Sequence, residues 1–174
     1  MTRDVSWVLA LRRYLCVVAL ASLAWESAQL PLYTLWKTGS AREMAFMVAH
    51  CTGGDVLIAG TTLIGSLLLI GMTGWPQAGF LPVAATTVIS GLGTTAIIEH
   101  VSTARGFSTY SDLMPLLPGT NIGFSPLVQW IVIPTPAFAA ARSALSKRSL
   151  DLPIMGSPTS RATPHQARSD QVVP

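Results

Sequence analysis

Three long stretches almost without charge constrain what this chain can fold into. They hold only three charged side chains: Glu26 in residues 14–36, Asp55 and Glu99 in residues 44–104, and none in residues 113–141. A helix rises about 1.5 Å per residue, so about 20 apolar residues cross the roughly 30 Å hydrocarbon core of a bilayer. Charged residues make up 11% of the 174, against about 25% in ordinary soluble domains. The chain is therefore predicted to lie in a membrane.

Glycine and proline divide these stretches into four candidate membrane helices, which predicts an all-α membrane protein built as a small four-helix bundle. The four spans cover residues 14–36, 44–70, 79–101 and 124–141. The segment TGWPQAG (73–79) predicts a tight turn, so the second and third spans should form an antiparallel hairpin with Trp75 at the membrane interface. Pro126, Pro134 and Pro136 predict that the fourth helix is kinked.

The segments outside the spans predict the orientation. Residues 1–13 are a basic N-terminus, and residues 142–174 are a Ser-, Pro- and Arg-rich tail that we expect to be disordered. Lys and Arg concentrate on the cytoplasmic side, and four spans place both termini on one side. Eight of the eleven Lys and Arg then share that side, since only Lys37, Arg42 and Arg105 fall opposite. We expect a multi-pass protein of a bacterial inner (plasma) membrane with both termini cytoplasmic.

The first span also has features of a cleaved signal peptide. A basic start precedes an apolar run from Tyr14 to Ala24, with small residues within it. The apolar stretch then continues to Trp36, beyond the length of a usual signal core. We therefore expect this segment to be retained as a membrane helix.

A polar cluster is predicted inside the spans. Its candidate residues are Glu26, Gln29, Tyr33, His50, Asp55, Glu99 and His100. A charged side chain that faces lipid is costly, and the spans contain no Lys or Arg, so the carboxylates should face the bundle interior. Glu26, Gln29 and Tyr33 recur at helical spacing along one face, and Gly91, Thr95 and Glu99 repeat every four residues.

Helical rise indicates the depth of these residues. Glu26 and Asp55 fall about 15 Å below the outer boundary, which is close to the midplane. His50 falls about 9 Å down the second helix, and Glu99 with His100 near the outer rim. The cluster should therefore lie toward the outer side.

Four interpretations of this cluster remain open. His50, Asp55, Glu99 and His100, with Glu26, could hold zinc, iron or manganese, although the His50–Asp55 spacing matches no known signature. Haem held between His50 and His100 is a second cofactor hypothesis. Glu26 and Asp55 could form a proton or solute pathway in a dimer, although the sequence lacks an internal repeat. The plainest interpretation is a hydrogen-bonded network that fixes helix packing.

Signatures of catalysis are missing. The sequence has no Walker loop, no G-x-S-x-G, no H-E-x-x-H and no Cys-x-x-Cys. Cys16 and Cys51 belong at opposite ends of their helices, too far apart for a disulfide. We expect a protein that is not an enzyme and has no cofactor, with metal or haem as the alternative.

The outer loop carries Tyr110, Ser111 and Asp112 among prolines and glycines. It is predicted to be a proline-rich connector in which Ser111 or Asp112 caps a short helix. The functional alternative is a lid over the polar cluster, because the loop starts on the side where Glu99 and His100 emerge.

Four ordered motifs carry a family resemblance. They are WESAQLPLY (25–33), HCTGGDVLIA (50–59), YSDLMPLLP (110–118) and GFSPLVQW (123–130). Together they resemble a family of small uncharacterised bacterial inner-membrane proteins with four spans. The resemblance implies the four-span topology and no activity, and it covers residues 25–141. At matching positions it highlights Glu26, Gln29, Tyr33, His50, Asp55, Tyr110, Ser111, Pro115 and Gln129.

The resulting prediction is a non-enzymatic membrane component with an outward-biased polar cluster. The alternative is a proton- or metal-linked carrier or membrane enzyme that uses Glu26, His50 and Asp55. The expected partners are the lipid bilayer and a second copy or another membrane protein, and no nucleic acid.

Overall fold

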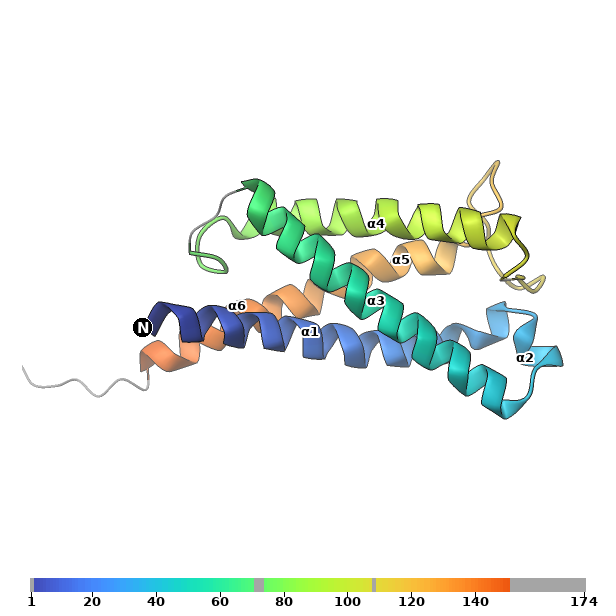
Figure 1. Cartoon of the computed structure of the whole chain (residues 1–174), viewed down its shortest axis with the longest axis horizontal. Coiled ribbons are helices and arrows are strands. Elements are labelled where there is room, and N and C mark those ends of the chain that lie inside the picture. Colours follow the sequence, from blue (N-terminus) through green and yellow to red (C-terminus); the bar gives the residue numbers. More distant parts are fainter. Residues whose placement is uncertain (1, 71–73, 108, 151–174) are drawn as a thin grey trace, which may run out of the picture.

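The computed structural model describes residues 2–70, 74–107 and 109–150. Within these ranges the chain is helical and has no strand (Figure 1). Its elements are α1 (Thr2–Gln29), the short 3-10 helix η1 (Leu30–Leu32), α2 (Leu35–Thr38), α3 (Ala41–Ile70), α4 (Phe80–Ala104), α5 (Phe124–Val132) and α6 (Pro134–Leu150). Four segments are long and apolar enough to cross a membrane: Trp7–Leu32, Ala41–Ile70, Phe80–Ala104 and Phe124–Ser143. The predicted all-α bundle of four membrane-length helices is confirmed.

The first span differs from its predicted bounds. Helix α1 begins at Thr2, so the segment predicted as a basic N-terminus is part of the helix. It ends at Gln29 rather than continuing to Trp36, and η1 follows with Pro31 near its start. Proline disfavours helical geometry in the residue before it and has no N–H to donate, which explains the early end. Glu26 therefore lies in the last turn of α1, closer to the end of the bundle than predicted.

Helices α3 and α4 form the predicted antiparallel hairpin and pack along each other. Trp75, which was predicted to lie at the membrane interface, is part of the turn between them. Its side chain is 3% exposed and belongs to the apolar core. The buried indole closes this end of the bundle together with neighbouring apolar side chains.

The fourth span is broken, as its prolines predicted. Helix α5 ends at Val132 and α6 begins at Pro134, since the proline ring cannot donate to the carbonyl four residues earlier. Helix α6 runs to Leu150, so residues 142–150 are helical where a disordered tail was predicted. The rest of the predicted tail, residues 151–174, lies outside the described residues.

The two halves of the broken span belong to different helix pairs. Helix α6 packs along α1, whereas α5 packs along α4 (Figure 1). The α6 half is held by aromatic packing: the ring of Phe138 lies 4.8 Å from Tyr14 and 5.9 Å from Phe80 between centroids. Helix α1 begins and helix α6 ends on the same side of the bundle (Figure 1).

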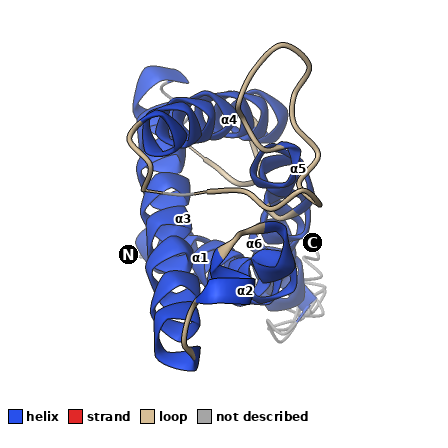
Figure 2. Cartoon of the chain, turned by 90° about the vertical axis from the view of Figure 1, so that its right-hand side faces the viewer, coloured by secondary structure: helices blue, strands red, loops and turns tan. Residues whose placement is uncertain are grey.

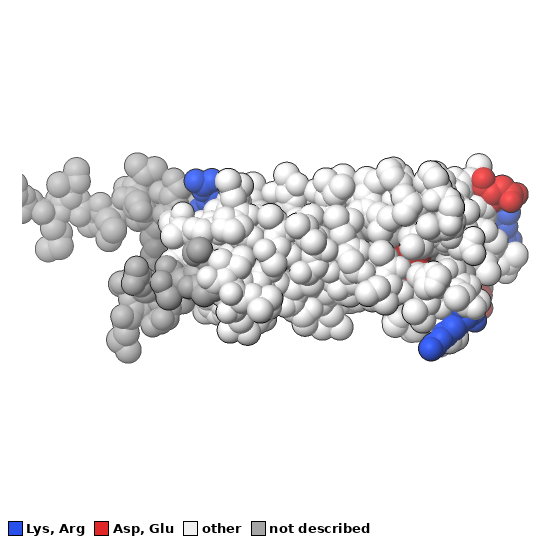
Figure 3. Space-filling model, turned by 90° about the horizontal axis from the view of Figure 1, so that it is seen from above, with Lys and Arg blue, Asp and Glu red and all other residues white. Residues whose placement is uncertain are grey.

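Charged side chains gather at the two ends of the molecule. Figure 3 shows Lys and Arg at both ends and a long uncharged band between them. Acidic atoms are also visible in a hollow toward one end of this band. This end carries the connections that follow α1 and α4, and it contains the polar cluster.

Candidate functional site

A cavity of about 470 Å³ occupies this end of the bundle. Figure 2 looks along the bundle onto this end, with the loop that follows α4 crossing the view. Its wall is formed by Glu26, Gln29, Leu30, Tyr33, Phe46, Met47, Val48, His50, Cys51, Gly54, Asp55, Ile58, Thr95, Ile98, Glu99, Ser102, Phe107, Pro126 and Gln129. Helices α1, α3, α4 and α5 all contribute, so the cavity depends on the whole fold.

Three carboxylates from three different helices line this cavity: Glu26 of α1, Asp55 of α3 and Glu99 of α4. None of the described residues in the wall is Lys or Arg. Glu26 is only 7% exposed. The carboxylates predicted to face the interior therefore share one compartment, with no basic side chain in its wall.

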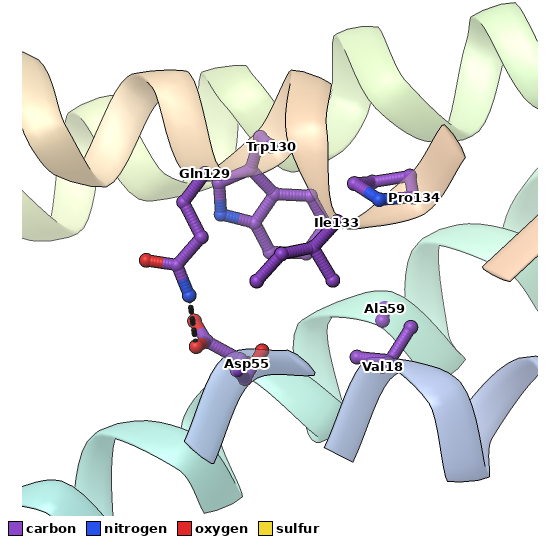
Figure 4. Close-up of a pocket in the computed structure, with 8 residues that line it drawn as sticks. Val18, Asp55, Ala59, Gln129, Trp130, Ile133 and Pro134 are labelled. Atoms are coloured by element: carbon purple, nitrogen blue, oxygen red, sulfur yellow. Dashed lines mark hydrogen bonds between the residues drawn. The ribbon is translucent and has the colours of Figure 1, made fainter. Parts of the chain in front are cut away.

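Gln129 of α5 holds one of these carboxylates. Its side-chain amide donates a hydrogen bond to Asp55 (Figure 4). Gln129 is 3% exposed, so this contact lies inside the protein. The amide carries no charge, and it orients the Asp55 carboxylate without neutralising it.

A second and much smaller cavity lies next to this contact. It measures about 10 Å³ and is lined by Val18, Ser22, Asp55, Ala59, Gln129, Trp130, Ile133 and Pro134 (Figure 4). Apart from the polar groups of Ser22, Asp55 and Gln129, its wall is apolar. Asp55 thus sits between the large cavity and the apolar half of the bundle that contains α6.

Gln29 joins the C-terminal end of α1 to α5. Its side-chain oxygen accepts hydrogen bonds from the Trp25 indole at 3.2 Å and from the Ser125 hydroxyl at 2.8 Å. Because Ser125 follows the first residue of α5 directly, this contact ties the end of α1 to the start of α5. The cavity wall is therefore held by side-chain hydrogen bonds between helices.

The outer loop is tied to the α1–α3 connection. The Thr34 amide donates to the Thr109 carbonyl at 3.0 Å, and the Ser111 amide donates to the Leu32 carbonyl at 2.9 Å. The Ser111 hydroxyl donates to the Pro31 carbonyl at 3.0 Å. Residues 109–123 contain turns and no helix, so the predicted capped helix is wrong. Asp112 is exposed.

Tyr110 connects this loop directly to the cavity. Its hydroxyl donates to Glu99 and accepts from the Gly123 amide at 3.1 Å. Its ring lies 5.5 Å from that of Tyr33, a residue of the cavity wall. Burial, and then the Glu99 carboxylate beside it, raise the pKa of the Tyr110 phenol above its ordinary value. The phenol therefore stays protonated as a donor to Glu99 at neutral pH.

The histidines are not brought together as the metal and haem hypotheses required. His50 lines the cavity and stacks on Phe46 with 5.7 Å between ring centroids. His100 is exposed and is not part of the cavity wall, because its neighbour Glu99 takes the inward position. Within the described ranges, no three His, Cys, Asp or Glu side chains are grouped closely enough to hold a metal ion. The predicted set of His50, Asp55, Glu99 and His100 is thus not assembled.

Sequence reasoning did not select several residues of the wall. Thr95 shares the four-residue repeat of Glu99 but was treated as a packing residue. Phe46 and Phe107 gave no signal, because an aromatic residue near a span end is ordinarily assigned to the lipid interface. Only the spacing of Thr95 and Glu99 could have pointed to a shared inward face.

No protein-family model matches the chain, and no curated protein and no solved structure matches it either. The resemblance to a family of small inner-membrane proteins therefore stays a prediction. What the cavity can bind must be derived from its geometry and chemistry.

Proposed function

We propose that this multi-pass protein binds a positively charged solute in the carboxylate-lined cavity and is a non-enzymatic component of a bacterial inner membrane. The observation that carries this proposal is the meeting of Glu26, Asp55 and Glu99 in one cavity whose described wall has no Lys or Arg. Ionised carboxylates inside a membrane protein require a partner, since an unpaired charge in low-dielectric surroundings is costly. A bound cation supplies that partner.

The proposed orientation places both termini in the cytoplasm and the cavity toward the outer side. Arg12 and Arg13 lie on α1, and Arg142 lies on α6. Helix α1 begins and α6 ends at the bundle end opposite the loop that follows α4 (Figure 1). Basic residues favour the cytoplasmic face. A solute that enters from the periplasm would then meet the loop of Tyr110 first and the three carboxylates behind it.

A proton-linked carrier is the second candidate, and the meeting of Glu26 and Asp55 in one cavity wall favours it. In a carrier, the cation would displace a proton from one of these two carboxyl groups. Binding would then release protons into unbuffered solution, in proportion to the cation bound. A cation-binding component that is not proton-linked would release none at a pH where its carboxyl groups are ionised.

Cys51 offers a direct test, because it lies in the cavity wall and the only other cysteine is Cys16. In a Cys16→Ser background, intact cells are treated with a trimethylammonium or a sulfonate methanethiosulfonate reagent, neither of which crosses the membrane. We expect the cationic reagent to modify Cys51 at least ten times faster than the anionic one, after correction for their reactivity with a free thiol. A neutral methyl reagent controls for access.

The matched variants lie side by side on α4. Glu99→Gln should lower the rate ratio severalfold, whereas His100→Gln, outside the cavity wall, should leave it unchanged. Equal rates for the two charged reagents would contradict cation selection. Labelling only in inside-out vesicles would contradict the proposed orientation.

A further inference from the structure

One buried polar group in the cavity wall has no hydrogen-bond partner among the described residues. It is the hydroxyl of Thr95, a residue that is 8% exposed. Thr61, Thr62, Thr87, Thr94 and Thr103, by contrast, each donate to the backbone carbonyl four residues earlier. An unpaired buried hydroxyl is costly. Thr95 lies in the cavity wall one helical turn before Glu99, which indicates that a ligand forms the missing hydrogen bond with its hydroxyl.

The rest of the wall is suited to an apolar body. Phe46, Met47, Ile58, Ile98 and Phe107 line the cavity together with the polar group. Aromatic faces attract cations and stack on other rings, and the methionine side chain adapts its shape to what it contacts. A bare ion would leave this surface uncovered.

The size of the cavity also favours a molecule over an ion. Its volume of about 470 Å³ falls within the roughly 300–1,000 Å³ that is typical of small-molecule sites. A small inorganic ion would fill only a small part of such a space. The remaining volume must hold water or an organic group.

We infer that the ligand of this cavity is a protonated organic amine with an apolar or aromatic body. This inference rests on the proposed function, because it specifies which kind of cation the cavity takes. The ammonium group supplies N–H donors for the Thr95 hydroxyl and for the carboxylates of Glu26 and Glu99. The body of the amine contacts the aromatic and aliphatic side chains of the wall.

Isothermal titration of the purified full-length protein in lipid nanodiscs tests this inference, with 2-phenylethylammonium as the probe. Empty nanodiscs correct for partition into lipid. We expect saturable binding, with at least tenfold weaker binding of 2-phenylethanol, which lacks the charge, and of ethylammonium, which lacks the ring. Mg²⁺ should not compete at equal concentration.

Two threonines provide a matched pair of variants. Thr95→Val removes the unpaired hydroxyl with little change in volume and should weaken binding of 2-phenylethylammonium about fivefold to tenfold. Thr94→Val is the control, because that hydroxyl is already bonded to the Ser90 carbonyl. Glu99→Gln should weaken binding by at least as much as Thr95→Val, and gel filtration checks that each variant remains folded.

The outcomes separate this inference from the proposed function. Equal binding of 2-phenylethanol, or binding of Mg²⁺ without binding of the amine, would overturn the inference while charge-selective labelling of Cys51 still supports a cation site. Unchanged affinity in both Thr95→Val and Glu99→Gln would also overturn it. Loss of charge selection at Cys51 would overturn both the proposed function and the inference that the ligand is an amine.

Discussion

The side-chain amide of Gln129 on α5 donates a hydrogen bond to the carboxylate of Asp55 on α3, so one buried polar contact joins these helices across the bundle. Gln129 is 3% exposed, which keeps water from competing for the bond. Hydrogen bonds between membrane helices are worth about 0.6 kcal/mol on average and up to about 1.7 kcal/mol. This contact should lie within that range.

The first prediction is a measurable coupling between these two residues. Gln129→Leu and Asp55→Leu, made singly and together, should give a coupling energy of about 1 kcal/mol in the free energy of unfolding. Reversible unfolding in mixed detergent micelles measures it. The control pair Gln129→Leu with Thr94→Val should be additive, because no described hydrogen bond joins them. Additive effects for Gln129 and Asp55 would show that their bond contributes nothing to stability.

The second prediction concerns close packing between α4 and α5. Gly91 is buried beneath Trp130, and a Cβ atom at Gly91 would overlap the indole ring. Gly91→Ala should therefore destabilise the protein by about 1–3 kcal/mol. Gly93→Ala is the control, because a Cβ there meets nothing within 4 Å. Thermal unfolding of the two variants should differ, and Trp130→Leu should partly restore Gly91→Ala.

The third prediction is a pH dependence that comes from Tyr110. Its pKa is raised above the ordinary value of 10.0, so the folded state holds the phenolic proton more tightly than the unfolded state. The stabilisation is complete below pH 10 and is lost as the pH rises above it. The free energy of unfolding should thus fall more steeply above pH 10 in the wild type than in Tyr110→Phe.

The same variant should be less stable than the wild type at neutral pH, because Phe cannot donate to Glu99 or accept from the Gly123 amide. The two stability curves should therefore approach each other at alkaline pH. Asp112→Asn is a suitable control in the same loop, since Asp112 is exposed. Parallel curves for the wild type and Tyr110→Phe would rule out the raised pKa.

The fourth prediction is the orientation in the membrane. A green fluorescent reporter fused to the C-terminus should fluoresce, because it folds in the cytoplasm. Alkaline phosphatase inserted at exposed Gly119 should be active, because it folds in the periplasm. The reverse pattern would place the cavity on the cytoplasmic side and contradict the proposed route of entry.

The charge-free stretches predicted the number and type of the long helices because the bilayer imposes a minimum length on any span. The residues at which these helices begin and end were less predictable. Hydropathy alone extended the first span to Trp36, whereas Pro31 ends helical geometry at Gln29 for a local steric reason. Trp75 was assigned to the interface from residue type alone, and the packing of its side chain into the core was not predicted, because that packing depends on tertiary contacts.

The carboxylates of the site were predictable because burying a charge in a membrane protein needs an interior position. The positions of the histidines were not predictable, since His50 and His100 can each lie inside or outside the cavity depending on how far their helix is rotated. The aromatic wall from Phe46 and Phe107 could not be anticipated from one sequence. It depends on which helix faces which across the bundle.

The break at Ile133 gives the two halves of the molecule different mechanical properties. The half around Phe138 is held by aromatic and aliphatic contacts that do not change with charge. The half around Gln129 is held by the packing of Trp130 on Gly91 and, in addition, by polar bonds whose strength depends on whether the carboxyl groups carry protons or face a cation. A change of ligand or pH would therefore loosen or tighten the contacts of α5 and leave those of α6 unchanged.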